Sequence, residues 1–557
     1  KAGLKHAGMA IHKSNYRHMK KTFLLLSIIS FCLGSISAQS FVGKLNPNPS
    51  SDFKNFTQSD TLKILAVLSD FQTDIDDATF GDGKFESIYS KDYGKSILDP
   101  LPHDKLYFEN HLKFVQNYFA KVSDGKLNIS YTVLDKILTV SKTMRNYTPD
   151  LNDVNNLTPL GNYVQEVWAL ADNQYPNFKF SDYDLFIVFH AGVGKDISLP
   201  GSLGNERDLP SVYLSNKSIK NIFGSNFEGF PVNGGKYKIK NTAIMPETES
   251  REVDGFDGSV LIELTTNGLL AATVGSYLGL PDLFNTETGR SAIGRFGLMD
   301  GQSMFSFQGI YPPEPSAWEK MRLGWVTPTE ISLNDASVSL VNKYVANGTD
   351  TTIIKIPTNA TEYYLIENRK RDALQDGSKV TYISNGQTLT KTFDRDYLNY
   401  IYYAVDTLEG VIIDVDEYDW ALPAADRNYD IEKFKDVGLI IWHIDERIIS
   451  ENYETNSINN DRYKRGVAIV EADGIRDIGE EFQTVFGETV IGEGTKEDTW
   501  YSSNPADYYE NKFSANTKPK AESNTGTNSL ITLSNFSDIS NRTTFDISFG
   551  SEFIDLI

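Results

Sequence analysis

An apolar segment over residues 259–280 constrains the fold of this chain more than any other stretch of the sequence. Its hydrophobic residues predict a helix, with Asp257 or Ser259 near the N-cap. Positions 272 and 276 stand one helical turn apart, so their side chains point into the same part of the molecule. The helix then runs into Gly279-Leu280-Pro281-Asp282, where the glycine and the proline bend the chain.

The spacing of this segment is that of the zinc-binding motif H-E-x-x-H-x-x-G-x-x-D. In that motif the two histidines bind the metal, the glutamate activates a water molecule, and the glycine bends the chain toward a third ligand. Here Ala272 and Ser276 stand at the two histidine positions and Thr273 at the glutamate position. Alanine offers no donor and hydroxyl groups are poor zinc ligands, so no catalytic position is intact. Only Asp282 remains, as a remnant of a zinc-ligand position.

One carboxylate cannot hold catalytic zinc, so we expect zinc to be absent or weakly bound. We expect Asp282 to cap or hydrogen-bond the loop after the helix instead. The other interpretation is a metal site rebuilt from histidines, of which four follow the first 38 residues: His103, His111, His190 and His443.

Further motifs flank this segment in a fixed order. They are Lys63 to Phe71, Ser123-Asp124-Gly125-Lys126-Leu127, Gly294 to Gly301 with Met299, Ser316-Ala317-Trp318-Glu319-Lys320, Tyr363 to Arg369, Gly438 to Glu446, and Val470-Glu471-Ala472-Asp473-Gly474. The ordered run, over about residues 60–550, closely resembles the immune-inhibitor-A-like secreted metallopeptidases, peptidase family M6. The resemblance implies a zincin/metzincin-like domain, a turn that carries Met299 beneath the metal, and zinc-dependent peptide hydrolysis as the ancestral activity.

A chain of 557 residues is too long for one typical core, so two or three domains are expected. We predict an α+β fold in which a metallopeptidase-like domain over residues 61–330 precedes a β-rich, sandwich-like domain over residues 331–557. In the first domain, strands are predicted at residues 64–68, 127–133 and 184–190, and a helix at 108–120. In the second, short alternating runs at residues 337–341, 351–356 and 363–366 predict strands.

Residues 19–38 have the features of a bacterial-type signal peptide: a basic start, an apolar middle and small residues before Ala38. We therefore expect a secreted or periplasmic protein cleaved after Ala38, and interpret residues 1–18 as an upstream artefact. Residues 39–60 are rich in Asn, Pro and Ser and are predicted to be a short leader or linker. No later apolar run reaches the roughly 18 residues that would span a membrane.

The exported chain is strongly acidic. Removal of residues 1–38 takes away six Lys and Arg and no acid, so the net charge changes from −22 to −28. This charge argues against nucleic acid and anionic membranes as partners. The only cysteine, Cys32, is lost with the signal peptide, so disulfides cannot stabilise the exported chain, and bound calcium is one candidate substitute.

Three acidic groups are candidate calcium sites. None has the EF-hand spacing, and acidic loops are commonly just solvated. The candidate ligands are Asp70, Asp74, Asp76 and Asp77; Asp254 and Asp257; and Asp414 and Asp416, with Glu417 and Asp419 close by.

We predict a catalytically inactive homologue that binds peptide, protein or glycan in the retained cleft. The alternative is an active zinc endopeptidase with an atypical metal site, and a third class is a structural or surface-assembly component. An open, aromatic-lined groove beside Ser276 would favour binding. Motifs of serine hydrolases, P-loop nucleotide sites and dinucleotide sites are absent from the sequence.

Overall fold

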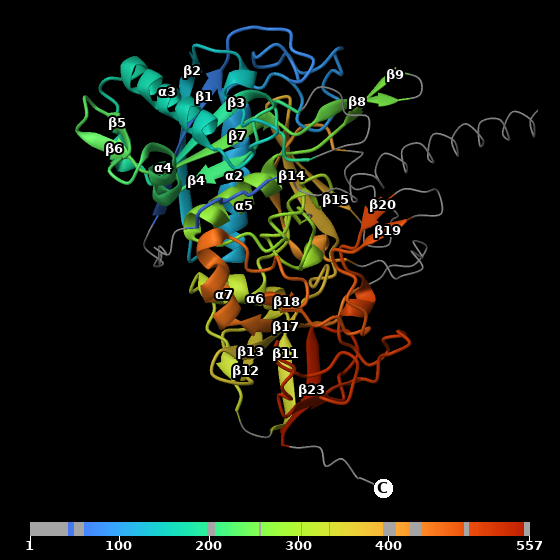
Figure 1. Cartoon of the computed structure of the whole chain (residues 1–557). Coiled ribbons are helices and arrows are strands. Elements are labelled where there is room, and N and C mark those ends of the chain that lie inside the picture. The colour runs from blue at the N-terminus through green and yellow to red at the C-terminus, as the bar shows by residue number, and fades with distance from the viewer. Residues whose placement is uncertain are drawn as a thin grey trace, which may run out of the picture.

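The computed structural model describes residues 43–49, 61–197, 206–255, 258–301, 303–332, 335–393, 408–423, 436–483 and 489–550. The predicted signal peptide and the residues before it lie outside this part of the chain. The fold is mixed α and β, with several sheets and few helices, in agreement with the predicted α+β class. The first half of the chain forms the upper part of the molecule and the second half the lower part (Figure 1).

The first half is built on a five-stranded sheet of order β2-β1-β3-β7-β4. Its strands are β1 (Thr61–Asp70), β2 (Asn128–Thr139), β3 (Leu185–Val193), β4 (Val212–Leu214) and β7 (Thr242–Thr248). The first four in the order run parallel, and β4 pairs antiparallel with β7 at one edge. The strands predicted at residues 64–68, 127–133 and 184–190 are confirmed. All of β3 is buried, as expected for a parallel strand covered on both faces.

Helices cover both faces of this sheet. The helices are α2 (Lys105–Val122), α3 (Thr158–Gln174), α4 (Asn216–Phe223) and α5 (Asn267–Leu278). Alternation along β1 separates them, because Ile64 and Ala66 join the core of α2 and α5, whereas Leu65 and Val67 join that of α3 and α4. The helix predicted over residues 108–120 is confirmed as α2.

The helix predicted over residues 259–280 begins later than expected, and that boundary is wrong. Strand β9 (Gly258–Ile262) pairs with β8 (Arg251–Gly255) as an antiparallel hairpin, and α5 has Thr266 as its N-cap. The run Val260-Leu261-Ile262 is short and rich in β-branched residues, which suits a strand. The helix ends close to the predicted position, since Gly279 adopts a left-handed φ of 102° at the C-cap.

Two further sheets dominate the second half. The five-stranded sheet contains β10 (Thr329–Glu330), β12 (Ile353–Pro357), β13 (Glu362–Asn368), β17 (Leu439–Asp445) and β18 (Val467–Ile469). The four-stranded sheet contains β11 (Asp335–Val341), β21 (Lys512–Phe513), β22 (Ile531–Ser534) and β23 (Arg542–Phe549). Side chains of both sheets, such as Ile366 and Phe545, share one buried cluster. The three strands predicted at residues 337–341, 351–356 and 363–366 are confirmed.

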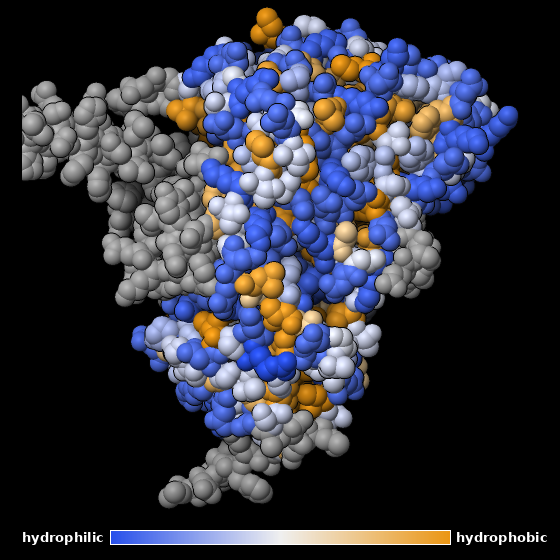
Figure 2. Space-filling model, turned by 180° about the vertical axis from the view of Figure 1, so that it is seen from behind, coloured by the Kyte–Doolittle hydropathy of each residue, from blue (hydrophilic) through white to orange (hydrophobic). Residues whose placement is uncertain are grey.

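Smaller elements complete the described part. They are the sheet β15 (Gln387–Phe393), β14 (Ser378–Ser384) and β16 (Val411–Val415); the hairpins β5 (Phe230–Val232) with β6 (Tyr237–Ile239) and β19 (Glu481–Gln483) with β20 (Thr489–Ile491); and the helices α6 (Ala317–Arg322) and α7 (Glu446–Asn452). Seen from behind, hydrophilic residues cover most of the surface and hydrophobic residues form small separate groups (Figure 2).

The two predicted domains share a hydrophobic core. One buried cluster contains Ile64 of β1 and Leu270 of α5 together with Leu365 of β13 and Trp442 of β17. The short alternating runs that begin after Pro328 therefore mark a change of secondary structure. The hydrophobic core continues across this position.

Helix α6 connects the two halves through buried charges. Glu319 forms a capping box with Ser316 and also accepts hydrogen bonds from the N–H groups of Leu298 and Met299, at 3.3 and 3.0 Å. The next residue, Lys320, forms a 3.0 Å ion pair with Glu367 of β13. The helix thus holds the Met299 turn on one side and the second half of the chain on the other.

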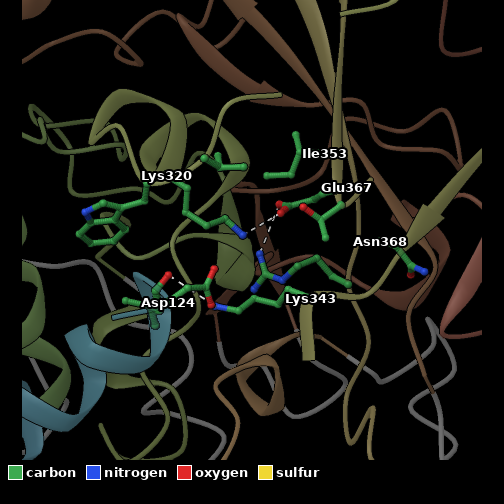
Figure 3. A pocket seen from close by; sticks show the side chains of 11 residues that line it. Asp124, Lys320, Lys343, Ile353, Glu367 and Asn368 are labelled. Atoms are coloured by element: carbon green, nitrogen blue, oxygen red, sulfur yellow. Dashed lines mark hydrogen bonds and ion pairs between the residues drawn. The ribbon is translucent and has the colours of Figure 1, made fainter. Parts of the chain in front are cut away.

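Two more ion pairs lie beside this contact. Arg369 Nε is 2.6 Å from Asp419 Oδ1, and Lys343 Nζ is 2.6 Å from Glu314 Oε1. Figure 3 shows Lys320 directed toward Glu367 and Asp124 toward Lys343, around a small pocket of about 30 Å³. The three cations and three anions of the three pairs balance one another, as buried charges require.

Loss of one of these charges is expected to destabilise the whole chain. Arg369→Leu leaves Asp419 and Glu367 buried with uncompensated charge, so the free energy of unfolding in urea should fall by about 3–5 kcal/mol. Arg290→Leu is the matched control, because the Arg290–Glu481 pair is 43% and 50% exposed and should contribute less than about 1 kcal/mol. Equal effects of the two variants would contradict the role given to the buried network.

Candidate functional site

The three residues that stand at the catalytic positions of the zinc motif are buried in the core. Helix α5 is buried on every side, and Ala272, Thr273 and Ser276 are at most 1% exposed. The Thr273 hydroxyl donates a hydrogen bond back to the carbonyl of Leu269 at 2.8 Å, so it does not face a metal site. An α-helix that is apolar all round belongs to a core, and α5 fits that description.

Asp282 is held by a residue from the far end of the chain. Its backbone N–H donates to Asn456 Oδ1 at 2.8 Å, and Asn456 Nδ2 donates to Asp282 Oδ2 at 2.6 Å. Asn456 follows α7 and has a left-handed φ of 52°, a conformation that asparagine tolerates. Asp282 thus bonds a residue far from it in sequence, whereas the expected partner was the loop after the helix. The sequence gives no signal that singles out Asn456.

Burial raises the pKa of Asp282 from its ordinary value to about 7. The Asn456 amide, the backbone N–H groups of Asn46 and Leu45 and the Lys44 ammonium act in the opposite direction without cancelling the effect. The carboxyl is therefore poised to change charge near neutral pH.

The segment at residues 43–49, inside the predicted leader, covers this site. Leu45 and Asn46 are fully buried. Asn46 Nδ2 donates to the carbonyl of Ser276 at 3.3 Å, and its own carbonyl accepts a hydrogen bond from Asn456 Nδ2 at 2.7 Å. Residues 43–49 thus cover the position beside Ser276 where an open groove would favour binding.

The Met299 turn lies directly against α5. A Cβ added to Gly275 would stand 2.8 Å from Met299 Sδ, so only glycine allows this approach. The carbonyl of Met299 also accepts a 2.8 Å hydrogen bond from the N–H of Leu283. The backbone of the former metal site is therefore tied together without a metal.

The residues present do not fit catalytic zinc. Zinc requires three protein donors and an open position for water. At these positions the chain supplies a methyl group, a hydroxyl that bonds its own helix, a buried serine and one carboxylate already bonded to Asn456.

The four histidines do not converge on α5. His103 Nδ1 lies 2.8 Å from Glu247, and His111 Nδ1 lies 2.8 Å from Asn267 Oδ1 at the start of α5. His190 bonds the carbonyl of Ala191, and His443 Nε2 lies 2.9 Å from Glu362. None of them joins a group of three metal-ligating side chains among the described residues.

The predicted calcium ligands mostly have partners within the protein. Asp70 pairs with Lys84 at 3.1 Å, Asp76 with Arg145 at 2.9 Å and Asp414 with Lys121 at 2.5 Å. Asp416 accepts hydrogen bonds from two backbone N–H groups. Asp74 is half-buried and Asp77 exposed, Asp254 lies in β8, and Asp257 falls outside the described residues.

One other acidic group is compact. Glu471, Asp477 and Asp498 bring one carboxylate oxygen each within 4.8 Å of one another, and in the described part of the chain no other such group of three or more occurs. Burial raises the pKa of Glu471 to about 7. Glu471 stands in the Val470–Gly474 motif, but the sequence does not link it to Asp477 and Asp498, because the three residues meet through folding and not through a recognisable spacing.

Two comparisons with known proteins did not identify a relative of this chain. A scan against models of protein families and a search of curated proteins both found no match. The resemblance to peptidase family M6 therefore depends on the order of the motifs alone, and membership stays a prediction.

The titration of Asp282 predicts a pH-dependent effect of Asp282→Asn. Because the folded pKa of about 7 lies above the ordinary 3.8, the stability contributed by this carboxyl is full below pH 3.8 and lost as the pH rises through 7. The amide of the variant does not titrate. The free energy of unfolding of the variant minus that of the natural chain should therefore increase by about 2–3 kcal/mol from pH 5 to pH 8. Chemical denaturation at the two pH values measures this. A difference that is independent of pH would mean that a bound cation or another group neutralises the carboxylate.

Proposed function

We propose that this chain is an exported, M6-like protein without peptidase activity that binds an extended peptide along the outer edge of β4, beside the C-terminal end of α5. The observation that most supports the loss of activity is the donor set around Asp282, which lacks two of the three ligands that catalytic zinc needs. The alternative of an active zinc endopeptidase has no comparable support, because none of the four histidines lies with Ser276 and Asp282.

The contacts along β4 favour a peptide over a glycan as the ligand. Strand β4 is the last strand of its sheet, and the N–H of Tyr213 points away from β7 to donate to the carbonyl of Leu45 at 2.7 Å. The hydroxyl of Ser215 donates to the carbonyl of Asn48 at 2.8 Å. A strand N–H and the hydroxyl of the residue that follows the strand thus both bind peptide carbonyls, a recognition that a peptide backbone offers and a glycan does not.

Export is part of this proposal and depends on the signal-peptide features of residues 19–38. None of the described helices has the length and apolar character needed to cross a membrane. The acidic charge of the chain makes nucleic acid an unfavourable partner. The ligand is therefore sought among extracellular or periplasmic polypeptides.

Metal analysis with an activity assay tests the catalytic half of the proposal. Purified full-length protein, incubated with zinc and then passed through a desalting column, is expected to hold far less than one zinc per chain and to leave casein uncleaved. One zinc per chain, removed by a chelator together with casein cleavage, would revive the enzyme alternative.

Restoring the motif tests the alignment behind the resemblance. The variant Ala272→His, Thr273→Glu, Ser276→His places two histidine donors and the water-activating glutamate with Asp282 and should gain zinc affinity measurable by titration calorimetry. These positions are buried, so a fall in stability of about 1–3 kcal/mol for each enlarged side chain is expected. A folded variant without zinc affinity would count against the alignment.

A further inference from the structure

We propose that this protein cleaves its own chain at the peptide bond between Asp99 and Pro100. The Asp99 carboxylate is the nucleophile, and His103 polarises the carbonyl that it attacks. This is the only Asp–Pro bond in the sequence. The reaction takes place within one molecule, requires no metal ion and does not depend on the proposed peptide binding.

The backbone carbonyl of Asp99 is bound by a buried imidazolium. His103 Nε2 donates a hydrogen bond to this oxygen at 3.0 Å, and His103 Nδ1 lies 2.8 Å from Glu247 Oε1. Glu247 also accepts hydrogen bonds from the N–H groups of Glu86 and Gly192, as an ionised carboxylate does. Both nitrogens of His103 therefore carry a proton. A positive donor at this distance stabilises the negative charge that develops on the oxygen during attack.

The charge on this imidazolium is maintained by its partner. His103 and Glu247 are fully buried. Burial alone would lower the pKa of His103, but the hydrogen bond and the charge of Glu247 raise it above its ordinary value. The polarising group is thus present in its charged form.

The nucleophile belongs to the same residue as the carbonyl. Asp99 is fully buried, and within the described ranges neither of its side-chain oxygens has a hydrogen-bond partner. His111 Nε2 lies 3.6 Å from Asp99 Oδ2. His111 Nδ1 lies 2.8 Å from Asn267 Oδ1, an acceptor, because the Asn267 Nδ2 donates to the carbonyl of Ile412. The proton of His111 is therefore on Nδ1, and Nε2 can take a proton from the carboxyl.

Burial acts on both members of this pair. It raises the pKa of Asp99 and lowers the pKa of His111, and the attraction between the two charged forms opposes both changes. This favours a protonated carboxyl beside a neutral imidazole. Transfer of one proton between them gives the carboxylate that attacks.

The backbone at the bond is strained. Asp99 has a left-handed φ of 54°, whereas a residue before proline is normally extended because the proline ring crowds its other conformations. The N-terminal side is fixed by two hydrogen bonds: the N–H of Asp99 donates to the carbonyl of Gly410 at 3.0 Å, and the N–H of Leu98 to Glu263 Oε1 at 2.5 Å. Backbone strain of this kind is concentrated at functional sites. Cleavage would release it.

The proposed cleavage has two steps and consumes one water molecule. First, a side-chain oxygen of Asp99 bonds to the carbon of its own backbone carbonyl, and the bond from that carbon to the Pro100 nitrogen breaks. The nitrogen takes the proton that His111 received, and the product is a five-membered cyclic anhydride. Water then opens the anhydride to the side-chain carboxyl and a free α-carboxyl. Nothing is oxidised or reduced. Because nucleophile and carbonyl belong to one residue, no separate substrate has to be bound.

The two pieces are expected to remain associated. Residues 1–99 contain β1, which pairs with β2 on one side and with β3 on the other. Both neighbours belong to residues 100–557. Cleavage would therefore be seen only after the protein is unfolded.

Incubation of the purified full-length protein, followed by a denaturing gel and mass spectrometry, tests the inference. The products should end at Asp99 and begin at Pro100, and should elute together from a sizing column before denaturation. The rate should be at least about tenfold lower in urea that unfolds the chain, because the bond persists there without the histidines beside it. An uncut chain, a cut at another bond, or equal rates in the folded and unfolded chains would overturn the inference. So would a rate that increases with protein concentration or that a chelator abolishes.

Variants test the two residues directly. His103→Gln removes the positive donor, and Asp99→Asn removes the carboxylate while keeping a side chain that tolerates a left-handed backbone. Each should lower the rate at least about tenfold. His443→Gln is the matched control, because His443 also lies 2.9 Å from a carboxylate, that of Glu362, and it should cleave at the natural rate. A folded His103→Gln or Asp99→Asn variant that cleaves at the natural rate would overturn the inference. If neither variant folds, the comparison in urea decides.

Discussion

The contact of α6 with its surroundings is the interaction on which the rest of this structure depends. Glu319 fixes the backbone of the Met299 turn through hydrogen bonds, and Lys320 pairs with Glu367 of the second half. Met299 in turn lies against Gly275 of α5. The ion pairs are largely buried and balance in charge, so removing one partner would leave another buried and uncompensated. The position of α5 thus depends on charges that are far from it in sequence.

Protein contacts connect α5 with the loop after it and with the Met299 turn. In a zinc protein the metal bonds would hold the helix and the following turn together. Here the hydrogen bonds of Asp282 with Asn456, the packing of Met299 against Gly275 and the burial of Leu45 connect the same elements. A buried helix can have alanine and threonine at positions where a catalytic helix needs metal donors. Small side chains pack well at positions that do not face solvent, and the threonine hydroxyl bonds its own helix.

The strands and α2 were predictable because their signals are local. Alternation or a continuous apolar run fixes a strand such as β3, and the burial on both faces follows from parallel pairing. The start of α5 was not predictable, because residues 258–262 are apolar enough for either a helix or a strand, and pairing with β8 decides between them. The leader lacks periodicity, so nothing local indicates that Leu45 enters the core, where its carbonyl accepts a hydrogen bond from Tyr213 of β4.

By itself, the sequence determined the absence of a donor set, since no fold can make Ala272 a ligand, and it determined most of the strands, because side-chain periodicity expresses which faces are buried. Only the tertiary structure decided which groups replace the metal contacts and what lies in the groove. Asn456 and Asp282 are 174 positions apart. Their hydrogen bonds depend on how the backbone N–H of Asp282 and the side-chain amide of Asn456 are oriented where the two segments meet. No pattern along the chain encodes these orientations.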